Sequence, residues 1–255
     1  MGLSSNGKPT ILHEFEYLWN NINKMSGTAR LKYLTNLLKT TSKEDMASSV
    51  QKFAEGKILE RAKLARQYGS KLVYAGGVAQ NIIANSLIKP LFDDMWVPPA
   101  CGDAGSALGA AAYSYCKATG KDRINWVSPY LGYDIKKEIN VSEVVYYIME
   151  HKVCGIANGR AEWGPRALGN RSLLGDVRYD VKDTVNTIKQ RELFRPFAPA
   201  ILEEYASEYF EGPYNEYMQY ACKVKPITAE KYKSIVHVDG TARVQIVKKD
   251  CIKNR

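Results

Sequence analysis

The 255-residue chain contains 45% hydrophobic and 25% charged residues, which is typical of a globular protein and excludes wholesale disorder. Its net charge of +9 arises from 36 basic and 27 acidic side chains spread along the sequence without a long basic run. This spread favours a site for small anions over a nucleic-acid partner, and no apolar run approaches the roughly 18 residues of a membrane span.

The N-terminus and the cysteines favour a reduced, cytoplasmic protein without a membrane partner. The opening residues, MGLSSNGKPTILHEFEY, contain no apolar core of the signal-peptide kind. The cysteines are odd in number and form no CxxC pair, which is typical of a chain without disulfides. They are Cys101, Cys116, Cys154, Cys222 and Cys251.

Helices and strands alternate in the first part of the chain. Apolar residues at helical spacing predict a helix over 42–68, with Ser42 and Asp45 arranged as in a capping box. A strand, a glycine turn and a helix then follow one another twice, over 71–89 and 93–120. This order predicts an α/β fold whose ligands bind where strands end and helices begin.

Residues 124–140 combine proline, glycine and charge, so we interpret them as a linker. The remainder of the chain has an α+β pattern. Helices are predicted at 141–152, 183–192 and 199–210, and strands at 154–159, 217–224 and 241–247.

Two turns of the first part contain candidate ligand-binding residues. Gly76 and Gly77 end a strand and Asn81 opens the next helix, an arrangement that suits adenosine or phosphate, although most glycine pairs are simply tight turns. The second turn places Asp103 after Gly102 at a helix start. From spacing alone, we favour helix capping by this carboxylate over a metal-ligand or phosphate-site role.

The most unusual segment is GRAEWGPRALGNRS, residues 159–172, in which Arg160, Arg166 and Arg171 stand among glycines. Three guanidinium groups on rigid turns repel one another unless an anion compensates them, and arginine makes bidentate contacts to phosphate. Residues NTIKQRELFRPFAP then add cations beside aromatic rings. These cations are Lys189, Arg191 and Arg195.

The segment HVDGTARVQ contributes Asp239 and then Arg243 at the entrance to a strand. Its histidine, His237, is more often a satisfied core residue than a catalytic one. The alternative for the whole basic region is a solvated face with ion pairs to acidic neighbours. Those neighbours are Glu162, Asp176 and Glu192. The intervening glycines and aromatic residues favour a phosphate-binding pocket instead.

Five motifs together resemble those of the ATP-dependent O-carbamoyltransferases, enzymes that modify antibiotics and nodulation factors. In chain order they are GGVAQN, PPACGDAGSALGAA, GRAEWGPRALGNRS, IKQRELFRPFAP and HVDGTARVQ. The opening MGLSSNGKP is similar to an internal family motif, MGLAPYGKP, which argues against reading it as a myristoylation signal.

The resemblance implies two domains. Residues 1–123 would be the C-terminal half of an actin-like ATPase domain, and residues 141–255 an incomplete YrdC-like domain. The YrdC-like domain would bind carbamoyl phosphate and ATP and form carbamoyl-adenylate. The actin-like domain would pass the carbamoyl group to a hydroxyl of a small molecule, assisted by a divalent metal of the iron type.

Site residues follow from the matched motifs. The resemblance implies phosphate- and adenylate-binding catalytic roles for Arg166, Lys189, Arg195 and Arg243. It implies supporting cofactor-binding roles for Gly76, Gly77, Asn81, Gly102, Arg160, Asn170, Arg171, Ser172 and Asp239. It also makes Asp103 a metal ligand, which reverses the preference for a cap.

The chain departs from the family at both ends. The family's His-x-x-x-His metal pair has no counterpart, since no two of the histidines, His13, His151 and His237, have that spacing. The family's C-terminal Thr/Ser-Phe-Asn motif is also missing. We therefore expect a fragment or subunit of a longer enzyme, with separately encoded N- and C-terminal portions as partners, and metal binding only if histidines are supplied. The alternatives are a non-catalytic remnant that binds nucleotide or carbamoyl phosphate, and a threonylcarbamoyl-tRNA-type factor, which the diffuse charge disfavours.

Overall fold

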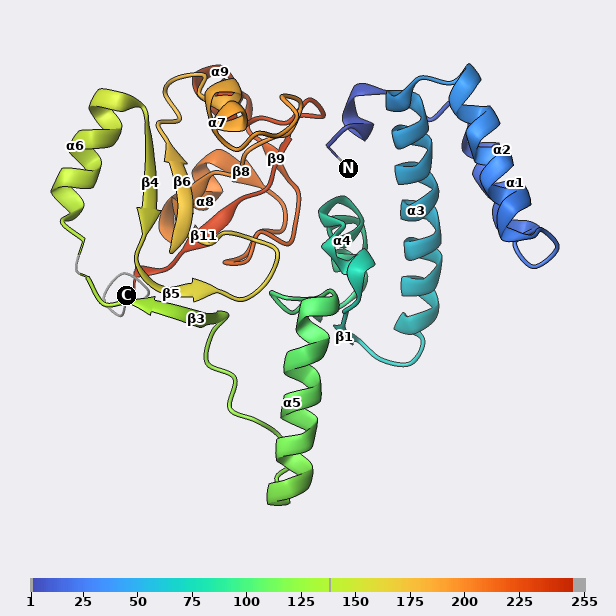
Figure 1. The fold of residues 1–255 in the computed structure, drawn as a ribbon, viewed down its shortest axis with the longest axis horizontal. Helices are drawn as coiled ribbons and strands as arrows, with labels where there is room; N and C mark the ends of the chain where they lie inside the picture. Colours follow the sequence, from blue (N-terminus) through green and yellow to red (C-terminus); the bar gives the residue numbers. More distant parts are fainter. Residues whose placement is uncertain (1, 138, 250–255) are drawn as a thin grey trace.

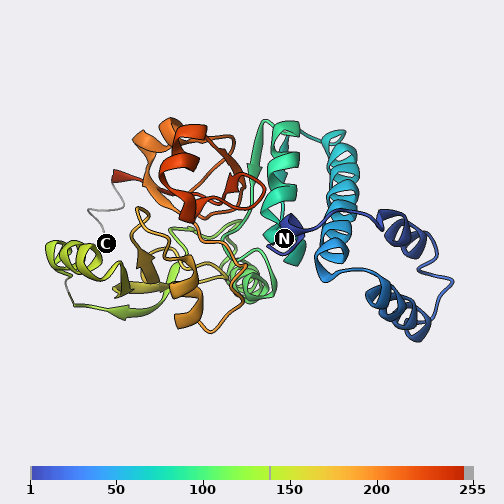
Figure 2. The ribbon, with the colours of Figure 1, turned by 90° about the horizontal axis from the view of Figure 1, so that it is seen from above.

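The computed structural model describes residues 2–137 and 139–249, which fold into two parts with the N-terminal segment lying between them (Figures 1 and 2). No helix in these residues combines the length and the apolar character that a membrane crossing requires. The cysteines in them are free thiols, and Cys251 lies outside the described residues.

The first part contains long helices and a pair of short parallel strands, in agreement with the predicted α/β order. The α3 helix begins after Ser42, whose hydroxyl accepts a hydrogen bond from the Asp45 N–H at 3.0 Å, so the predicted cap is confirmed. The elements, with 3₁₀ helices written η, are η1 (Ser4–Asn6), α1 (Leu12–Asn20), α2 (Gly27–Thr40), α3 (Lys43–Arg66), β1 (Lys71–Val73), η2 (Gly77–Gln80), α4 (Ile82–Ile88), η3 (Lys89–Leu91), β2 (Asp94–Trp96) and α5 (Asp103–Thr119).

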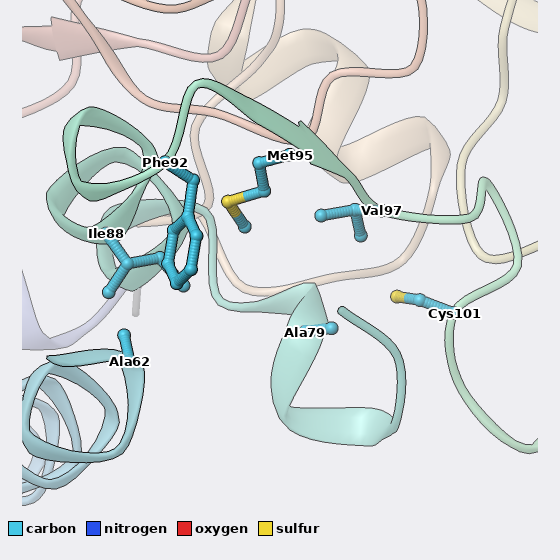
Figure 3. Close-up of a cluster of buried hydrophobic side chains, with 7 residues drawn as sticks. All are labelled: Ala62, Ala79, Ile88, Phe92, Met95, Val97 and Cys101. Carbon is cyan, nitrogen blue, oxygen red and sulfur yellow. The ribbon is translucent and has the colours of Figure 1, made fainter. Parts of the chain in front are cut away.

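A cluster of buried apolar side chains joins α3 and α4 to the two strands (Figure 3). Burial of a side chain the size of phenylalanine or isoleucine contributes roughly 1.5–3 kcal/mol, so this cluster fixes α4 on the strand pair. Its members are Ala62, Ala79, Ile88, Phe92, Met95, Val97 and Cys101.

The second part is a mixture of small sheets and short helices. β4 pairs antiparallel with β6, β3 with β5, and β9 with both β8 and β10, whereas β7 and β11 are parallel. The elements are β3 (Tyr130–Ile135), α6 (Val141–His151), β4 (Val153–Ala157), β5 (Gly159–Glu162), β6 (Arg171–Gly175), α7 (Lys182–Ile188), β7 (Ala200–Leu202), α8 (Glu203–Tyr209), β8 (Phe210–Glu211), β9 (Cys222–Val224), α9 (Pro226–Lys231), η4 (Lys233–Ile235), β10 (Thr241–Ala242) and β11 (Gln245–Val247).

The predicted linker and one predicted helix differ from the structure. The segment interpreted as a linker contains β3, which pairs with β5, and Gly132 is required there because a Cβ would lie 2.8 Å from the Ala161 Cβ. The predicted helix over 199–210 begins as the strand β7, because residues 200–202 pair with β11, and only α8 is helical.

Hydrogen bonds from buried and partly buried polar side chains connect the two parts. The Asn85 side chain, on α4, donates to the carbonyl oxygen of Gln219 at 3.0 Å, and the Gln219 side chain donates to that of Val97 at 2.6 Å. The Ser86 hydroxyl donates to the carbonyl of Ala221 at 2.8 Å. These bonds use the backbone of the predicted strand over 217–224, so that only Cys222–Val224 pairs as a strand.

Candidate anion-binding site

A cavity of about 490 Å³ lies where the two parts meet, a size that suits a small ligand. Ile82 and Ile83 of α4 and the N-terminal segment line one side. The second part contributes the cations, so the predicted convergence is found for Arg166, Arg195 and Arg243 and extends to two further residues. The cationic side chains in the lining are Arg166, Lys182, Arg191, Arg195 and Arg243.

Glu162 holds the turn that carries Arg166. Its carboxylate accepts hydrogen bonds from three backbone N–H groups, those of Leu168 at 2.7 Å, Asn170 at 2.8 Å and Arg171 at 3.3 Å. Glu162 therefore orders the glycine-rich turn through its backbone, in place of the ion pair that the alternative reading expected. Burial lowers the pKa of Arg166.

The end of α7 decides which cation of the IKQRE motif enters the cavity. The Arg191 N–H bonds to the carbonyl of Asn186 at 3.0 Å and the Gln190 N–H to that of Thr187 at 3.0 Å, which is the Schellman arrangement at a helix C-terminus. Gln190 takes the left-handed conformation, with φ of 50°. The chain therefore reverses after Lys189, which is exposed and absent from the lining, while Arg191 lines the cavity.

Arg243 lies between β10 and β11 and is the most desolvated cation of the site. Its Nε is buried and has no hydrogen-bond partner in the described residues. Burial, together with the charges of Arg166 and Arg191, lowers the pKa of Arg243 to about 9. An unpaired donor among like charges costs free energy, and an anion in the cavity would relieve it.

Arg195 lies at the exposed part of the lining, and its Nε donates to the Glu192 carboxylate at 2.6 Å. One of the ion pairs of the solvated-face alternative is therefore present here. Asp239 also lines the cavity, and its carboxylate accepts hydrogen bonds from the Thr241 hydroxyl at 2.7 Å and the Ser5 hydroxyl at 3.4 Å. The second bond ties the N-terminal segment to the second part.

His237 is a lining residue that the sequence analysis set aside. One ring nitrogen is 3.1 Å from the Thr241 hydroxyl and the other is 3.4 Å from the carbonyl of Phe197. Burial is the main reason that the pKa of His237 is lowered. Both ring nitrogens have partners, so the structure places this residue as a support of the cavity wall.

The remaining residues of the GRAEWGPRALGNRS motif do not line the cavity. The Arg171 guanidinium donates to four carbonyl oxygens at 2.7–3.1 Å. Asn170 donates to the carbonyl of Arg160 at 2.8 Å, and the Ser172 hydroxyl accepts from the Gly169 N–H at 3.1 Å. The Arg160 side chain is exposed. The expectation that three guanidinium groups of this motif share one pocket is therefore wrong, because Arg171 is used to hold strands together.

The two glycine turns of the first part lie side by side but outside the cavity lining. The Gly76 N–H donates to the carbonyl of Cys101 at 2.7 Å, and a Cβ on Gly102 would lie 2.7 Å from the Gln80 side chain. The Asn81 side chain caps α4, where its oxygen accepts from the Ala84 N–H at 3.2 Å.

The nucleotide-binding role expected for Gly76, Gly77 and Asn81 is compatible with the tight glycine turn but not with a free Asn81 side chain. Asn81 and Gln51 bond to each other through both amide groups, at 3.1 and 3.2 Å, so the Asn81 side chain is already paired. Gly77 opens η2, the turn that follows Gly76, whose φ is 105°. The adjacent turns form a compact backbone surface and contribute no cation.

Asp103 is the first residue of α5 and is exposed, while Gly102 occupies the cap position. The simple capping role is therefore wrong. Within residues 2–137 and 139–249 no three His, Cys, Asp or Glu side chains gather to hold a metal ion. A metal of the iron type needs about three protein ligands, so the residues present do not fit the expected centre.

Three contributors to the cavity have no sequence signal that assigns them to it. Arg191 was named only as one of the cations of the NTIKQRELFRPFAP segment. That segment contains no glycine to mark the turn that brings Arg191 into the cavity lining. Lys182 precedes the predicted helix and carries no motif. The N-terminal segment, residues 2–5, reaches the cavity only through tertiary packing, which no local pattern reveals.

The first and the second part of the chain match the two models of a single protein family. Residues 10–112 match a family model described as Carbamoyltransferase N-terminus, and residues 145–254 match one described as Carbamoyltransferase C-terminus. The chain is 36% identical over 239 residues to nodulation protein NolO of Bradyrhizobium diazoefficiens, which covers 82% of this chain and 44% of the relative.

Two further relatives show the same partial coverage. Nodulation protein U of Azorhizobium caulinodans is 38% identical over 202 residues, 74% of this chain and 36% of that protein. The uncharacterized protein MJ1051 of Methanocaldococcus jannaschii is 34% identical over 216 residues, 74% of this chain and 41% of that protein. The chain therefore spans less than half the length of these curated relatives.

Proposed function

The chain belongs to the carbamoyltransferase family, and from this premise we propose that its cavity binds carbamoyl phosphate and ATP and forms carbamoyl-adenylate. The observation that carries the proposal is the buried Nε of Arg243, which has no hydrogen-bond partner among the described residues, in a cavity also lined by Arg166, Arg191 and Arg195. Such a cluster has the charge and the donors that a phosphate or pyrophosphate group requires.

Carbamoyl-adenylate forms in two steps in this proposal. Water releases phosphate from carbamoyl phosphate to give carbamate, and a carbamate oxygen then bonds to the α-phosphorus of ATP as pyrophosphate leaves. Negative charge accumulates on the phosphoryl oxygens during the second step. Fixed guanidinium groups in a partly dry cavity stabilise that charge, because they are already oriented and are poorly screened by water.

Transfer to a substrate hydroxyl is proposed for the longer protein of which this chain is a portion or subunit. The acceptor oxygen attacks the carbamoyl carbon, AMP leaves, and the hydroxyl proton is released. In this proposal residues 1–123 are the C-terminal half of an actin-like ATPase domain and residues 141–255 an incomplete YrdC-like domain.

Carbamoyl-phosphate-dependent exchange of labelled pyrophosphate into ATP tests the adenylate step. We expect exchange that requires carbamoyl phosphate and is lost in the Arg166→Lys variant, because a point charge does not reproduce the planar fork of arginine. Lack of exchange by the chain, even when portions with the family's missing N- and C-terminal sequence are supplied, would contradict the proposal.

A second function, nucleotide or carbamoyl phosphate binding without turnover, is favoured by one observation. Among residues 2–137 and 139–249, Asp103 belongs to no group of three His, Cys, Asp or Glu side chains that could hold the metal implied by the family resemblance. Calorimetric binding of ATP, combined with mass spectrometry that detects no adenylate, would select this second function over the first.

A further inference from the structure

Asn186 is hydrogen-bonded to the loop that brings two arginines to the cavity. It lies on α7, and its side chain is fully buried, with 0% of the residue exposed. The residues that follow it, 190–195, include both Arg191 and Arg195. A buried amide must satisfy its donors and acceptor within the protein, so its partners show what it holds in place.

Each end of the Asn186 amide contacts this loop. Its oxygen accepts a hydrogen bond from the Nε of Arg191. Its nitrogen donates to the carbonyl of Arg195 at 3.0 Å and to that of Leu193 at 3.3 Å. One side chain therefore fixes the guanidinium of one cavity arginine and the backbone of the other.

Arg191 is restrained on a second side by an aromatic ring. Its guanidinium carbon lies 4.6 Å from the centre of the Phe197 ring. Asn186 engages the Nε, and within residues 2–137 and 139–249 the terminal nitrogens of Arg191 make no hydrogen bond, so they remain available to the cavity that Arg191 lines. A guanidinium held in this way loses less side-chain entropy when it binds an anion.

We propose that Asn186 is a positioning residue of the anion site, which orients Arg191 and Arg195 toward the phosphate groups of the ligand. This inference rests on the proposed function, because it deepens the account of the same cavity. Asn186 itself is not among the residues that line the cavity. It acts on binding only through the two arginines.

Calorimetric titration of the full chain with inorganic pyrophosphate tests the role. We expect Asn186→Ala to weaken binding about tenfold, the effect of one lost hydrogen bond to a charged group. Thr228→Val is the matched control, because Thr228 is equally buried in the second part and its hydroxyl donates only to the carbonyl of Tyr209. This control is expected to bind pyrophosphate as the wild type does.

A double-mutant comparison separates positioning from general destabilisation. If Asn186 acts through Arg191, Asn186→Ala costs much less affinity when Arg191→Ala is already present. An equal loss in both backgrounds, or wild-type affinity in Asn186→Ala, would overturn the proposal. Asn186→Ser, whose hydroxyl is too short to replace the amide, serves as the second variant if the alanine variant does not fold.

The NMR signal of the Arg191 Nε–H gives a readout that needs no ligand. We expect a signal protected from exchange in the wild type and lost in Asn186→Ala or Asn186→Ser. If the signal behaves so while wild-type chain binds no pyrophosphate, positioning stands and the proposed function fails. An unchanged signal in the variants overturns positioning whether or not pyrophosphate binds.

Discussion

The Arg166 guanidinium donates a hydrogen bond to the carbonyl oxygen of Gln80 across 3.4 Å. Arg166 belongs to the second part of the chain and Gln80 to the glycine turn of the first. Gly164, in the same turn as Arg166, lies so close to the first part that a Cβ would come within 3.0 Å of the Pro99 carbonyl. The cations of the cavity are therefore held against a wall that the other part supplies.

Arg243→Met is expected to raise the melting temperature while weakening pyrophosphate binding by roughly ten- to a hundredfold. The substitution removes a buried charge whose Nε has no hydrogen-bond partner in the part of the chain that the structure describes and which Arg166 and Arg191 repel, and it keeps most of the side-chain volume. Thermal unfolding and calorimetric titration measure the two effects. A lower melting temperature with unchanged affinity would show that Arg243 has a structural role only.

Arg171→Met is expected to have the opposite pattern. Its guanidinium donates to the carbonyls of Tyr133, Asn158, Gly159 and Asn170, so its loss removes a hydrogen-bond donor from each of these four acceptors. We expect the free energy of unfolding to fall by about 2–4 kcal/mol and the affinity for pyrophosphate to stay within about twofold. Denaturant unfolding measures the stability and calorimetric titration measures the affinity. A large loss of affinity in a folded variant would show that Arg171 contributes to anion binding.

Glu162→Gln is expected to loosen the turn that carries Arg166. The neutral amide keeps the shape of the side chain but gives weaker hydrogen bonds from the backbone, at a cost of about 1–2 kcal/mol. Hydrogen exchange should show faster exchange at the N–H groups of Leu168 and Asn170, which now bond to the carboxylate. Unchanged protection at both groups would contradict this role.

His237 is expected to make stability depend on pH. Because burial lowers its pKa in the folded chain, the unfolded chain binds more protons as the pH falls through the ordinary histidine value of about 6.5. The free energy of unfolding should therefore fall from pH 7.5 to pH 5.5. Denaturant unfolding of His237→Gln should show a smaller fall, and equal slopes in the two proteins would exclude His237 as the cause.

Periodic features of the structure were predictable from sequence. The α3 helix has apolar residues at helical spacing and a serine at its cap, so its start at Lys43 follows from local chemistry. The paired strands β1 and β2 follow from the repeated strand–turn–helix order. Local signals sufficed here because capping and amphipathic periodicity act within a few residues.

The position of Arg191 in the cavity lining was not predictable from sequence. The turn after Lys189 that places it there depends on a left-handed conformation of Gln190, at a position where glycine is usual. The carbonyl partners of Arg171 come from separate segments that only tertiary packing brings together. Gly132 suggested a linker from composition, whereas it allows β3 to lie close to Ala161 of β5. In each case the deciding contact is made with residues distant in sequence or with an uncommon backbone conformation.

The most direct test of the arginine cavity is titration of the wild-type chain with pyrophosphate, in which binding is measured by calorimetry and by the change in melting temperature. We predict saturable binding to one site, weakened by salt, and a melting temperature that rises with pyrophosphate concentration because the ligand binds only the folded chain. No heat of binding and no change in melting temperature at millimolar pyrophosphate would contradict the account.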